Sequence, residues 1–426
     1  MRRFLICVLL VMTADAIAWS QAGMTKFPLA RNTAGRRIPA TYFGMNLAGA
    51  TWKHPWPTVD VGAVRVFDAG WARLEPSKGK WDFQHLDKDV ADSVAHHADI
   101  DLILTSTPTW ASARPGEQNP YVFQPSGSRA EARDVADWEN YVRTVSKRYK
   151  GRVYVYELWN EPNMSNSYSG DVSSLIRMCK AAYKALKETD PAITVISPSP
   201  APEGGIIYLR KFIEQGGGST FDIAGFHFYD NLNAPSARPD KIVPAALQLR
   251  KMLSSLSLSD RPIWNTESGY YIQSSSRAAS KPHNFPLNAH VLSQKEAVDA
   301  LVRSYIIAWT VGIERFYWYA WGEPLFAFVD DNGTTAKNVT ASYATVRKWL
   351  LGKIVDSVDQ NDEGIWIVTL HSDGGRPEHI LWKTGAAQRF SIPKEWNAKR
   401  TEDPAGREVD LSAQSQELTE TPVFIR

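Results

Sequence analysis

Two glutamates close strand-like segments of the chain, and paired carboxylates in such positions suit acid–base and nucleophilic chemistry. Glu161 ends the run 153–161, and Pro162 behind it lacks the N–H that a central strand needs. Glu267 stands near the end of the later run 262–269. A carboxylic acid can protonate a glycosidic oxygen while a carboxylate across the bond meets the positive charge that develops on the sugar carbon. We predict that Glu161 and Glu267 face one cleft.

The distance between the two carboxyl groups would decide the stereochemistry, and the sequence leaves it open. A separation of about 5 to 5.5 Å is typical of retaining enzymes, whereas about 6.5 to 9.5 Å leaves room for the water that inverting enzymes use. Glu157 shares a side of its strand with Glu161 but lies a strand repeat deeper. We interpret Glu157 as a barrel-interior residue paired with an arginine.

The elements that must position these glutamates alternate regularly between strand and helix patterns. Such alternation predicts an α/β fold with a parallel (β/α)8 barrel, the TIM barrel, whose functional residues lie at the C-terminal strand ends. A doubly wound open sheet is the alternative, but no glycine-rich phosphate loop follows the first strand. The expected strands are 38–46, 61–68, 101–110, 153–161, 193–198, 221–229, 262–269 and 314–321.

The regions outside the barrel have other patterns. Residues 1–18 combine two arginines, a short apolar run and a small-residue cleavage site, which indicates a cleavable signal peptide and secretion or export to a bacterial periplasm. The barrel is expected over 39–353. Short strands with turn signals predict a small β-sandwich over 354–426, and the segment 19–38 is a candidate to complete it.

Composition narrows the possible partners. With 48 basic and 46 acidic side chains, the chain has no charge excess that would favour nucleic acid. After signal cleavage no stable membrane span is expected. The 16 Trp, 16 Tyr and 16 Phe supply flat rings that can stack on sugars as well as fill a core. No ligand set for a metal and no cofactor motif stands out, so we predict neither.

Four segments, in this order along the chain, carry a specific resemblance. They are 107–111 (TPTWA), 156–163 (YELWNEPN), 225–229 (GFHFY) and 266–269 (TESG). Together they resemble the retaining glycoside hydrolases of clan A and are most similar to family 39, over roughly residues 40–350. That family includes β-xylosidases, α-iduronidases and endoglycosidases that act on bacterial exopolysaccharides.

The resemblance implies roles for individual residues. Glu161 would be the general acid/base and Glu267 the nucleophile, while Asn160 would bind the sugar 2-hydroxyl. Arg65 and Tyr229 would keep Glu267 ionised, because a cation and a hydroxyl donor both favour the charged form. An ion pair between Arg65 and Glu157 is the structural alternative for that arginine.

The resemblance also implies substrate contacts around the carboxylates. His227 would line the same subsite, Trp318 would form an aromatic floor, and Trp110 and Trp321 are candidates for its walls. Ordinary core packing is the alternative for each of these four side chains.

These expectations combine into a secreted retaining hydrolase whose partner is a polysaccharide or oligosaccharide substrate. The moderate loop lengths favour cleavage at internal bonds, in a bacterial exopolysaccharide or a plant cell-wall glycan. Two alternatives stay open: an exo-acting glycosidase such as a β-xylosidase, and a carbohydrate-binding protein without turnover.

Overall fold

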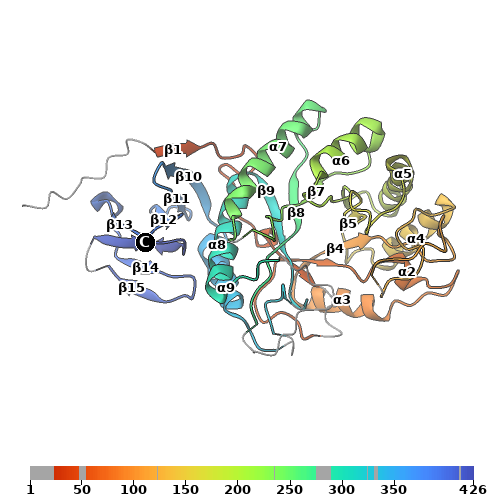
Figure 1. The fold of residues 1–426 in the computed structure, drawn as a ribbon, viewed down its shortest axis with the longest axis horizontal. Helices are drawn as coiled ribbons and strands as arrows, with labels where there is room; N and C mark the ends of the chain where they lie inside the picture. Colours follow the sequence, from red (N-terminus) through yellow and green to blue (C-terminus); the bar gives the residue numbers. More distant parts are fainter. Residues whose placement is uncertain are drawn as a thin grey trace, which may run out of the picture.

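The computed structural model describes residues 24–47, 54–121, 123–234, 236–274, 289–323, 325–330, 334–411 and 414–426. The signal peptide predicted at 1–18 lies outside these residues. Figure 1 shows a barrel with surrounding helices on the right and an antiparallel sheet region on the left.

Eight parallel strands form the barrel, as predicted. Their order is β6-β5-β4-β3-β2-β9-β8-β7, and a bridge between Ile196 and Ile223 joins the two edges. Their bounds are β2 Phe43–Leu47, β3 Ala63–Val66, β4 Asp99–Leu104, β5 Val155–Leu158, β6 Thr194–Ile196, β7 Ala224–His227, β8 Ile263–Ser268 and β9 Ile313–Trp318.

Amphipathic helices cover the outside of the barrel. Their apolar stripes pack on the strands, and local caps fix several starts: Asp134 and Asp171 accept backbone N–H bonds, and Ser293 forms a capping box with Glu296. The helices are α2 Trp71–Leu74, α3 Gln84–Ala95, α4 Val135–Arg148, α5 Val172–Thr189, α6 Gly205–Phe212, α7 Ile242–Ser255, α8 Gln294–Thr310 and α9 Asn338–Leu350. Short helical turns are η1 Ala40–Tyr42, η2 Ile213–Gly217, η3 Pro239–Lys241 and η4 Lys394–Trp396.

The C-terminal region is an antiparallel sheet with a second, two-stranded antiparallel sheet packed on one face. Seven strands run in the order β1-β10-β11-β12-β17-β14-β15, and β13 pairs with β16. Apolar residues of β11, β12 and β17 meet those of β13 and β16 in a separate core. The strands are β1 Met24–Phe27, β10 Ile354–Asn361, β11 Ile365–His371, β12 Glu378–Lys383, β13 Gln388–Ser391, β14 Arg400–Glu402, β15 Glu408–Asp410, β16 Ser415–Leu418 and β17 Val423–Ile425.

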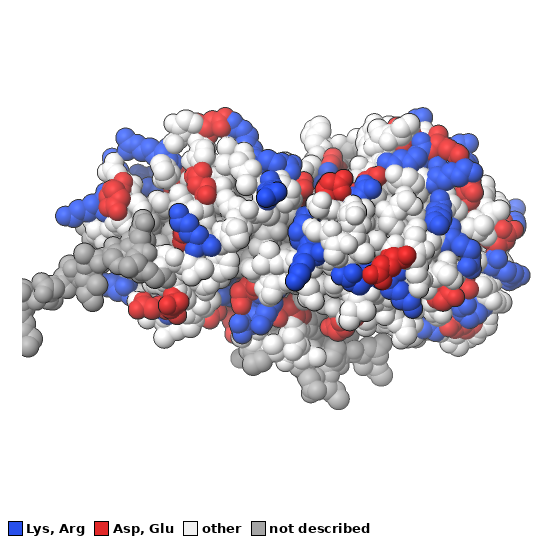
Figure 2. All heavy atoms as spheres, turned by 90° about the horizontal axis from the view of Figure 1, so that it is seen from above, with Lys and Arg blue, Asp and Glu red and all other residues white. Residues whose placement is uncertain are grey.

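The other face of the seven-stranded sheet shares one hydrophobic core with the barrel. Trp349 of α9 stacks on Phe424 of β17 with ring centroids 5.5 Å apart, and Trp366 stacks on Trp382 at 5.2 Å. Lysines and arginines alternate with aspartates and glutamates over the face in Figure 2, as the small net charge leads one to expect. Within the described residues, none of the helices is both long and apolar enough to cross a membrane.

Candidate active site

Glu161 lies in a sharply turned segment just beyond β5. The strand ends at Leu158, three residues before the end predicted from the sequence, so Glu161 lies three residues past the observed strand end. Trp159 and Glu161 both have positive φ, 71° and 46°, a conformation that is costly for residues with side chains. Two backbone bonds hold it: Trp159 N–H donates to Leu104 O at 3.0 Å, and Glu161 N–H donates to Ser199 O at 2.9 Å.

Glu267 lies within β8, near its C-terminal end, at an irregularity in the sheet. The pairing register shifts between Phe226 and His227 of β7, so His227 pairs with Glu267. Asn265 fixes this shift, because its Oδ1 accepts from Phe228 N–H at 3.1 Å and its Nδ2 donates to Ser268 Oγ at 2.8 Å.

The residue after this segment, Gly269, lies so close to the backbone of Tyr319 that a side chain would not fit. A Cβ placed at Gly269 would lie 2.2 Å from the carbonyl oxygen of Tyr319. The glycine of the TESG segment therefore allows the ends of β8 and β9 to meet behind Glu267.

Arg65 of β3 is fully buried and joins both strand-end motifs. It donates to Glu267 Oε2 at 2.6 Å, to Asn160 Oδ1 at 2.8 Å, and in a forked arrangement to Glu157 at 2.7 and 2.9 Å. Burial opposes its charge, but the carboxylates of Glu157 and Glu267 outweigh that effect and raise the pKa of Arg65. The ion pair with Glu157 and the contact with Glu267, posed as alternatives, therefore coexist, and the interior placement of Glu157 is confirmed.

Glu267 accepts a second bond from the hydroxyl of Tyr229, at 2.8 Å from Oε1. Burial and the neighbouring Glu267 charge raise the pKa of Tyr229 well above its usual value, so the phenol keeps its proton and remains a donor. Both oxygens of Glu267 thus receive hydrogen bonds, one from a cation. A hydrogen bond from a cation to a carboxylate is shorter and stronger than one between neutral groups.

Glu161 has the opposite environment. Its burial raises the pKa to about 7, opposed in part by Arg65 and aided by Glu203. Its side chain is 20% exposed, which leaves a path to substrate and water. A carboxyl group that holds its proton near neutral pH is suited to general acid catalysis.

His227 contacts Glu161 rather than Glu267. Its Nδ1 lies 2.9 Å from Glu161 Oε1, and its buried Nε2 has no hydrogen-bond partner among the described residues. Burial lowers the pKa of His227 to about 4, so the imidazole is neutral at pH 7 and the contact is a hydrogen bond, not an ion pair. The placement beside the predicted acid agrees with the sequence expectation.

The two glutamates lie close together across the barrel mouth. One oxygen of Glu161, one oxygen of Glu267 and a ring nitrogen of His227 all lie within 4.8 Å of one another. Carboxyl groups this close fit the arrangement in retaining glycosidases better than the wider spacing that holds a water in inverting enzymes.

The same three groups have the donor atoms that a metal ion would need. Glu267 already accepts from Tyr229 and Arg65, and the positive charge of Arg65 opposes a second cation beside it. We therefore interpret the cluster as an acid–base and nucleophile pair. That no metal or cofactor takes part stays a prediction.

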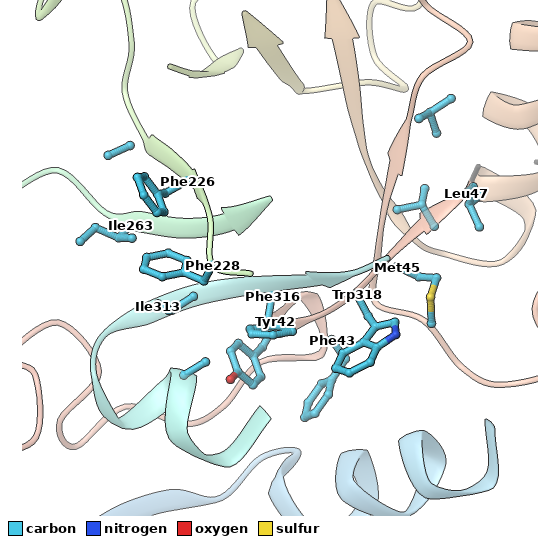
Figure 3. Packing of buried hydrophobic residues seen from close by; sticks show 14 of the residues in the cluster. Tyr42, Phe43, Met45, Leu47, Phe226, Phe228, Ile263, Ile313, Phe316 and Trp318 are labelled. Carbon is cyan, nitrogen blue, oxygen red and sulfur yellow. The ribbon is translucent and has the colours of Figure 1, made fainter. Parts of the chain in front are cut away.

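The structure corrects the prediction of Trp318 as the floor of the sugar site. The side chain is fully buried and packs with Tyr305 of α8 and Phe316 of β9, in the core seen in Figure 3. Successive residues of a strand point to opposite faces, and Trp318 takes the outer face of β9. Its neighbour Tyr319 is the aromatic residue on the carboxylate side: Glu267 and Glu161 are among the causes of its raised pKa, after burial and Glu323.

The two predicted wall tryptophans are held by backbone contacts away from the carboxylates. Trp321 is 2% exposed, and its indole donates to Pro55 O at 3.0 Å. Trp110 donates to Glu75 O at 2.9 Å and packs edge-on against Trp71. Neither indole has a described contact with Glu161 or Glu267, and the role of these two side chains as walls of the sugar site stays a prediction.

One contributor was absent from the sequence prediction. Asn46 of β2 is fully buried; its Oδ1 accepts from Arg65 at 3.1 Å, and its Nδ2 donates to Thr266 O at 3.2 Å. The signal for it was present, since an asparagine at the end of an apolar barrel strand calls for a polar partner.

Comparisons with known proteins agree with this geometry. A model of the family described as "Glycosyl hydrolases family 39" matches residues 110–310, which include both glutamates. No protein with a curated description matches the sequence significantly.

Three solved structures show a similar fold. A family 39 glycoside hydrolase from Bacteroides cellulosilyticus WH2 has a TM-score of 0.71 at 19% identity, covering 92% of this chain and 82% of its own. A GH39 β-xylosidase from Caulobacter crescentus has 0.60 at 13%, with 93% and 97% covered. A GH30 endoxylanase from Clostridium papyrosolvens C71 has 0.59 at 11%, with 95% and 99% covered.

Proposed function

We propose that the chain, which is a glycoside hydrolase similar to family 39, is a secreted retaining enzyme that cleaves internal bonds of a polysaccharide. The proposal is carried by one observation: two carboxyl groups with oxygens within 4.8 Å of each other have different environments. Glu267 is hydrogen-bonded by Arg65 and Tyr229, whereas Glu161 has a pKa raised to about 7.

In the first step, a Glu267 oxygen bonds to the anomeric carbon while the glycosidic C–O bond breaks. The proton of Glu161 passes to the leaving oxygen, which departs as a hydroxyl. In the second step, Glu161 takes a proton from water, whose oxygen bonds to the same carbon and displaces Glu267. The configuration at carbon is retained after two displacements.

Asn160 is oriented for the sugar by Arg65. Its Oδ1 accepts from the guanidinium, so its Nδ2 is left to donate to a hydroxyl acceptor. We propose that this donor binds the sugar 2-hydroxyl. Replacing Asn160 with Asp would remove the donor and should reduce kcat more than it raises KM, if the bond tightens in the transition state.

The nucleophile is tested by trapping. A 2-deoxy-2-fluoro glycoside with an activated leaving group should form a stable ester with the protein, and peptide mapping should locate it on Glu267. An ester on any other residue would contradict the proposed role.

The acid is tested by leaving-group dependence. Glu161→Gln should retain the first step with very acidic leaving groups such as fluoride, and lose it with alcohols that need a proton. Equal losses on both kinds of substrate would mean that Glu161 is not the general acid.

The polymer is tested with a panel of arabinoxylan, xyloglucan and bacterial exopolysaccharides. The names of two structural neighbours, a β-xylosidase and an endoxylanase, make arabinoxylan the first choice. Oligosaccharide products indicate internal cleavage, whereas monosaccharide alone indicates the exo alternative. Secretion is tested by N-terminal sequencing of exported protein, which should begin at Trp19.

A further inference from the structure

Two exposed aromatic rings stand together on the long loop between β4 and α4. Phe123 is 78% exposed and Tyr121 41%, and their ring centroids are 5.7 Å apart. In the described part of the chain the third exposed aromatic residue is Tyr154, which precedes β5 at the opposite end of the barrel from the glutamates. A pair of apolar rings left in water beside a catalytic cleft calls for an occupant.

The loop that carries the rings is firmly held. Gly127 N–H donates to Glu117 O at 2.7 Å, and Asn119 donates to Ser128 Oγ at 2.8 Å. Arg129 donates to Gln118 O at 2.9 Å and to the backbone of Ser165. The rings are therefore presented on a braced scaffold, which lowers the entropy cost of binding.

The same loop is tied to the segment that follows Glu161. Asn166 donates to the Tyr121 hydroxyl at 2.9 Å, and Ser169 donates to Glu117 Oε2 at 2.6 Å. The chain from Glu161 to Asn166 is tightly wound, since Met164 N–H bonds to Glu161 O. Consistent with this closeness, Glu161 and Glu267 both help to raise the pKa of Tyr121, after burial.

The position of Tyr121 on the Glu161 side identifies the part of the substrate that the rings would meet. The general acid must lie beside the leaving oxygen, so the sugar released in the first step departs past Glu161. We propose that Tyr121 and Phe123 form a stacking platform for a sugar unit on the leaving-group side of the cleaved bond. This inference rests on the proposed roles of Glu161 and Glu267, and it names the site that would bind the released part of the polymer.

The chemistry of the platform favours a neutral sugar face. Neither ring carries charge, and the hydroxyl of Tyr121 is already engaged by Asn166. The apolar C–H face of a pyranose can cover the rings and keep its own hydroxyl groups in water, whereas a charged group would lose hydration without gaining a partner.

Kinetics with two kinds of substrate separate the platform from the catalytic pair. Xylosyl fluoride has no sugar on the leaving side, whereas xylohexaose does. For Tyr121→Ala/Phe123→Ala, kcat/KM on xylohexaose should fall about tenfold or more, since one covered face of two aromatic rings is lost. Turnover of xylosyl fluoride by the same variant should stay within about twofold of wild type, because this substrate has no leaving sugar that could contact the two rings.

Two controls distinguish stacking from structural support. Tyr121→Phe keeps the ring but removes the bond to Asn166, and should lose much less kcat/KM on xylohexaose than Tyr121→Ala. Val409→Ala removes another exposed apolar side chain, in the distant strand β15, and should change neither substrate. The proposal is wrong if Tyr121→Phe lowers kcat/KM on xylohexaose as much as Tyr121→Ala does. It is also wrong if the double replacement lowers kcat/KM equally on both substrates.

Binding without turnover tests the platform independently of hydrolysis. Glu267→Gln protein is run through gels containing arabinoxylan, xyloglucan or a bacterial exopolysaccharide. Retardation by at least one polymer that is lost in the Tyr121→Ala/Phe123→Ala background supports the proposal. Equal retardation of both proteins, or none in any polymer, overturns it. Retardation by a polymer that wild-type protein fails to cleave would contradict the proposed hydrolysis and leave the platform intact.

Discussion

Arg65 is the residue on which the division of labour between the two glutamates depends. One guanidinium donates hydrogen bonds to Glu267, the proposed nucleophile, to Glu157, and to Asn160, which precedes the proposed acid Glu161. Glu161 has no hydrogen bond from Arg65 among the described contacts, and burial keeps its pKa near 7. Glu267 therefore has a hydrogen bond from a cation that Glu161 lacks, and this asymmetry, together with the burial of Glu161, supports the two proposed roles.

The raised pKa of Glu161 predicts the pH dependence of the first step. The acid must carry its proton, so kcat/KM on substrates with poor leaving groups should fall as pH rises through about 7. Glu161→Gln should lack this decline at alkaline pH, because glutamine has no carboxyl proton to lose. The variant can be assayed on a glycosyl fluoride, since fluoride departs without a proton from the acid. A decline that stays in place in Glu161→Gln would assign the titration to another group.

Tyr229→Phe removes one of the two donors to Glu267 while keeping the ring. A hydrogen bond to a charged group contributes about 1.5–3 kcal/mol, so kcat/KM should drop on the order of 10- to 100-fold. The loss should appear even with activated leaving groups, since it concerns the nucleophile. Thermal unfolding should change little, and a large drop in Tm would instead give Tyr229 a mainly structural role.

At the residue scale the polar contacts could be predicted but the aromatic ones could not. The sequence motifs place Arg65, Asn160, His227 and Tyr229 in the groups that the structure brings together. The prediction for Trp318 was wrong because successive residues of a strand point to opposite faces. A shift of one residue along the strand therefore puts Tyr319 on the face that was expected for Trp318. Nothing in a tryptophan's identity states which face of β9 it occupies.

At the scale of elements, the meeting of β8 with β9 sets the position of Glu267. Gly269 leaves room for the Tyr319 carbonyl, and the irregular pairing between β7 and β8 aligns His227 with Glu267. The strand segments were predictable from their apolar runs. The ends of the strands could not be predicted in this way. At Trp159 the backbone stops pairing as a strand, because Trp159 and Glu161 donate hydrogen bonds to residues at the ends of neighbouring strands.

Gly269→Ala tests this contact between strand ends. The added methyl would stand 2.2 Å from a backbone oxygen, so the ends of β8 and β9 must separate. We expect a loss of about 1–3 kcal/mol in the free energy of unfolding, measured in urea, and a larger fractional loss of kcat/KM. Gly116→Ala is the matched control, because a Cβ there meets no atom within 4 Å. Similar behaviour of the two variants would rule out the steric account.

At the scale of the whole molecule, the barrel and the seven-stranded sheet share a hydrophobic core. Trp366 and Trp382 are 4% and 1% exposed, so these indoles serve packing rather than an exposed sugar surface. The sequence indicated the change of pattern near residue 354 but missed β10, β14, β15 and β16. Those strands are rich in polar residues or very short, and their pairing partners rather than their own composition make them strands.

The shared core predicts that barrel and sheet unfold together. Calorimetry should show one transition, with loss of hydrolytic activity at the same temperature. Phe424→Ala, which removes a ring stacked on Trp349, should shift that single transition downward, with a loss of about 3–5 kcal/mol. Two resolved transitions, with activity surviving the first, would show instead that the barrel is stable alone.

The pairing of β1 with β10, and the position of β17 between β12 and β14, bear on the order of events during synthesis. Each neighbouring barrel strand from β2 to β6 can pair as it leaves the ribosome. The seven-stranded sheet cannot be assembled until β17, Val423–Ile425, has been made. Premature termination anywhere before these residues would therefore leave β12 and β14 unjoined and the shared core open. In a chain that is exported before it folds, β17 would insert between β12 and β14 only after export.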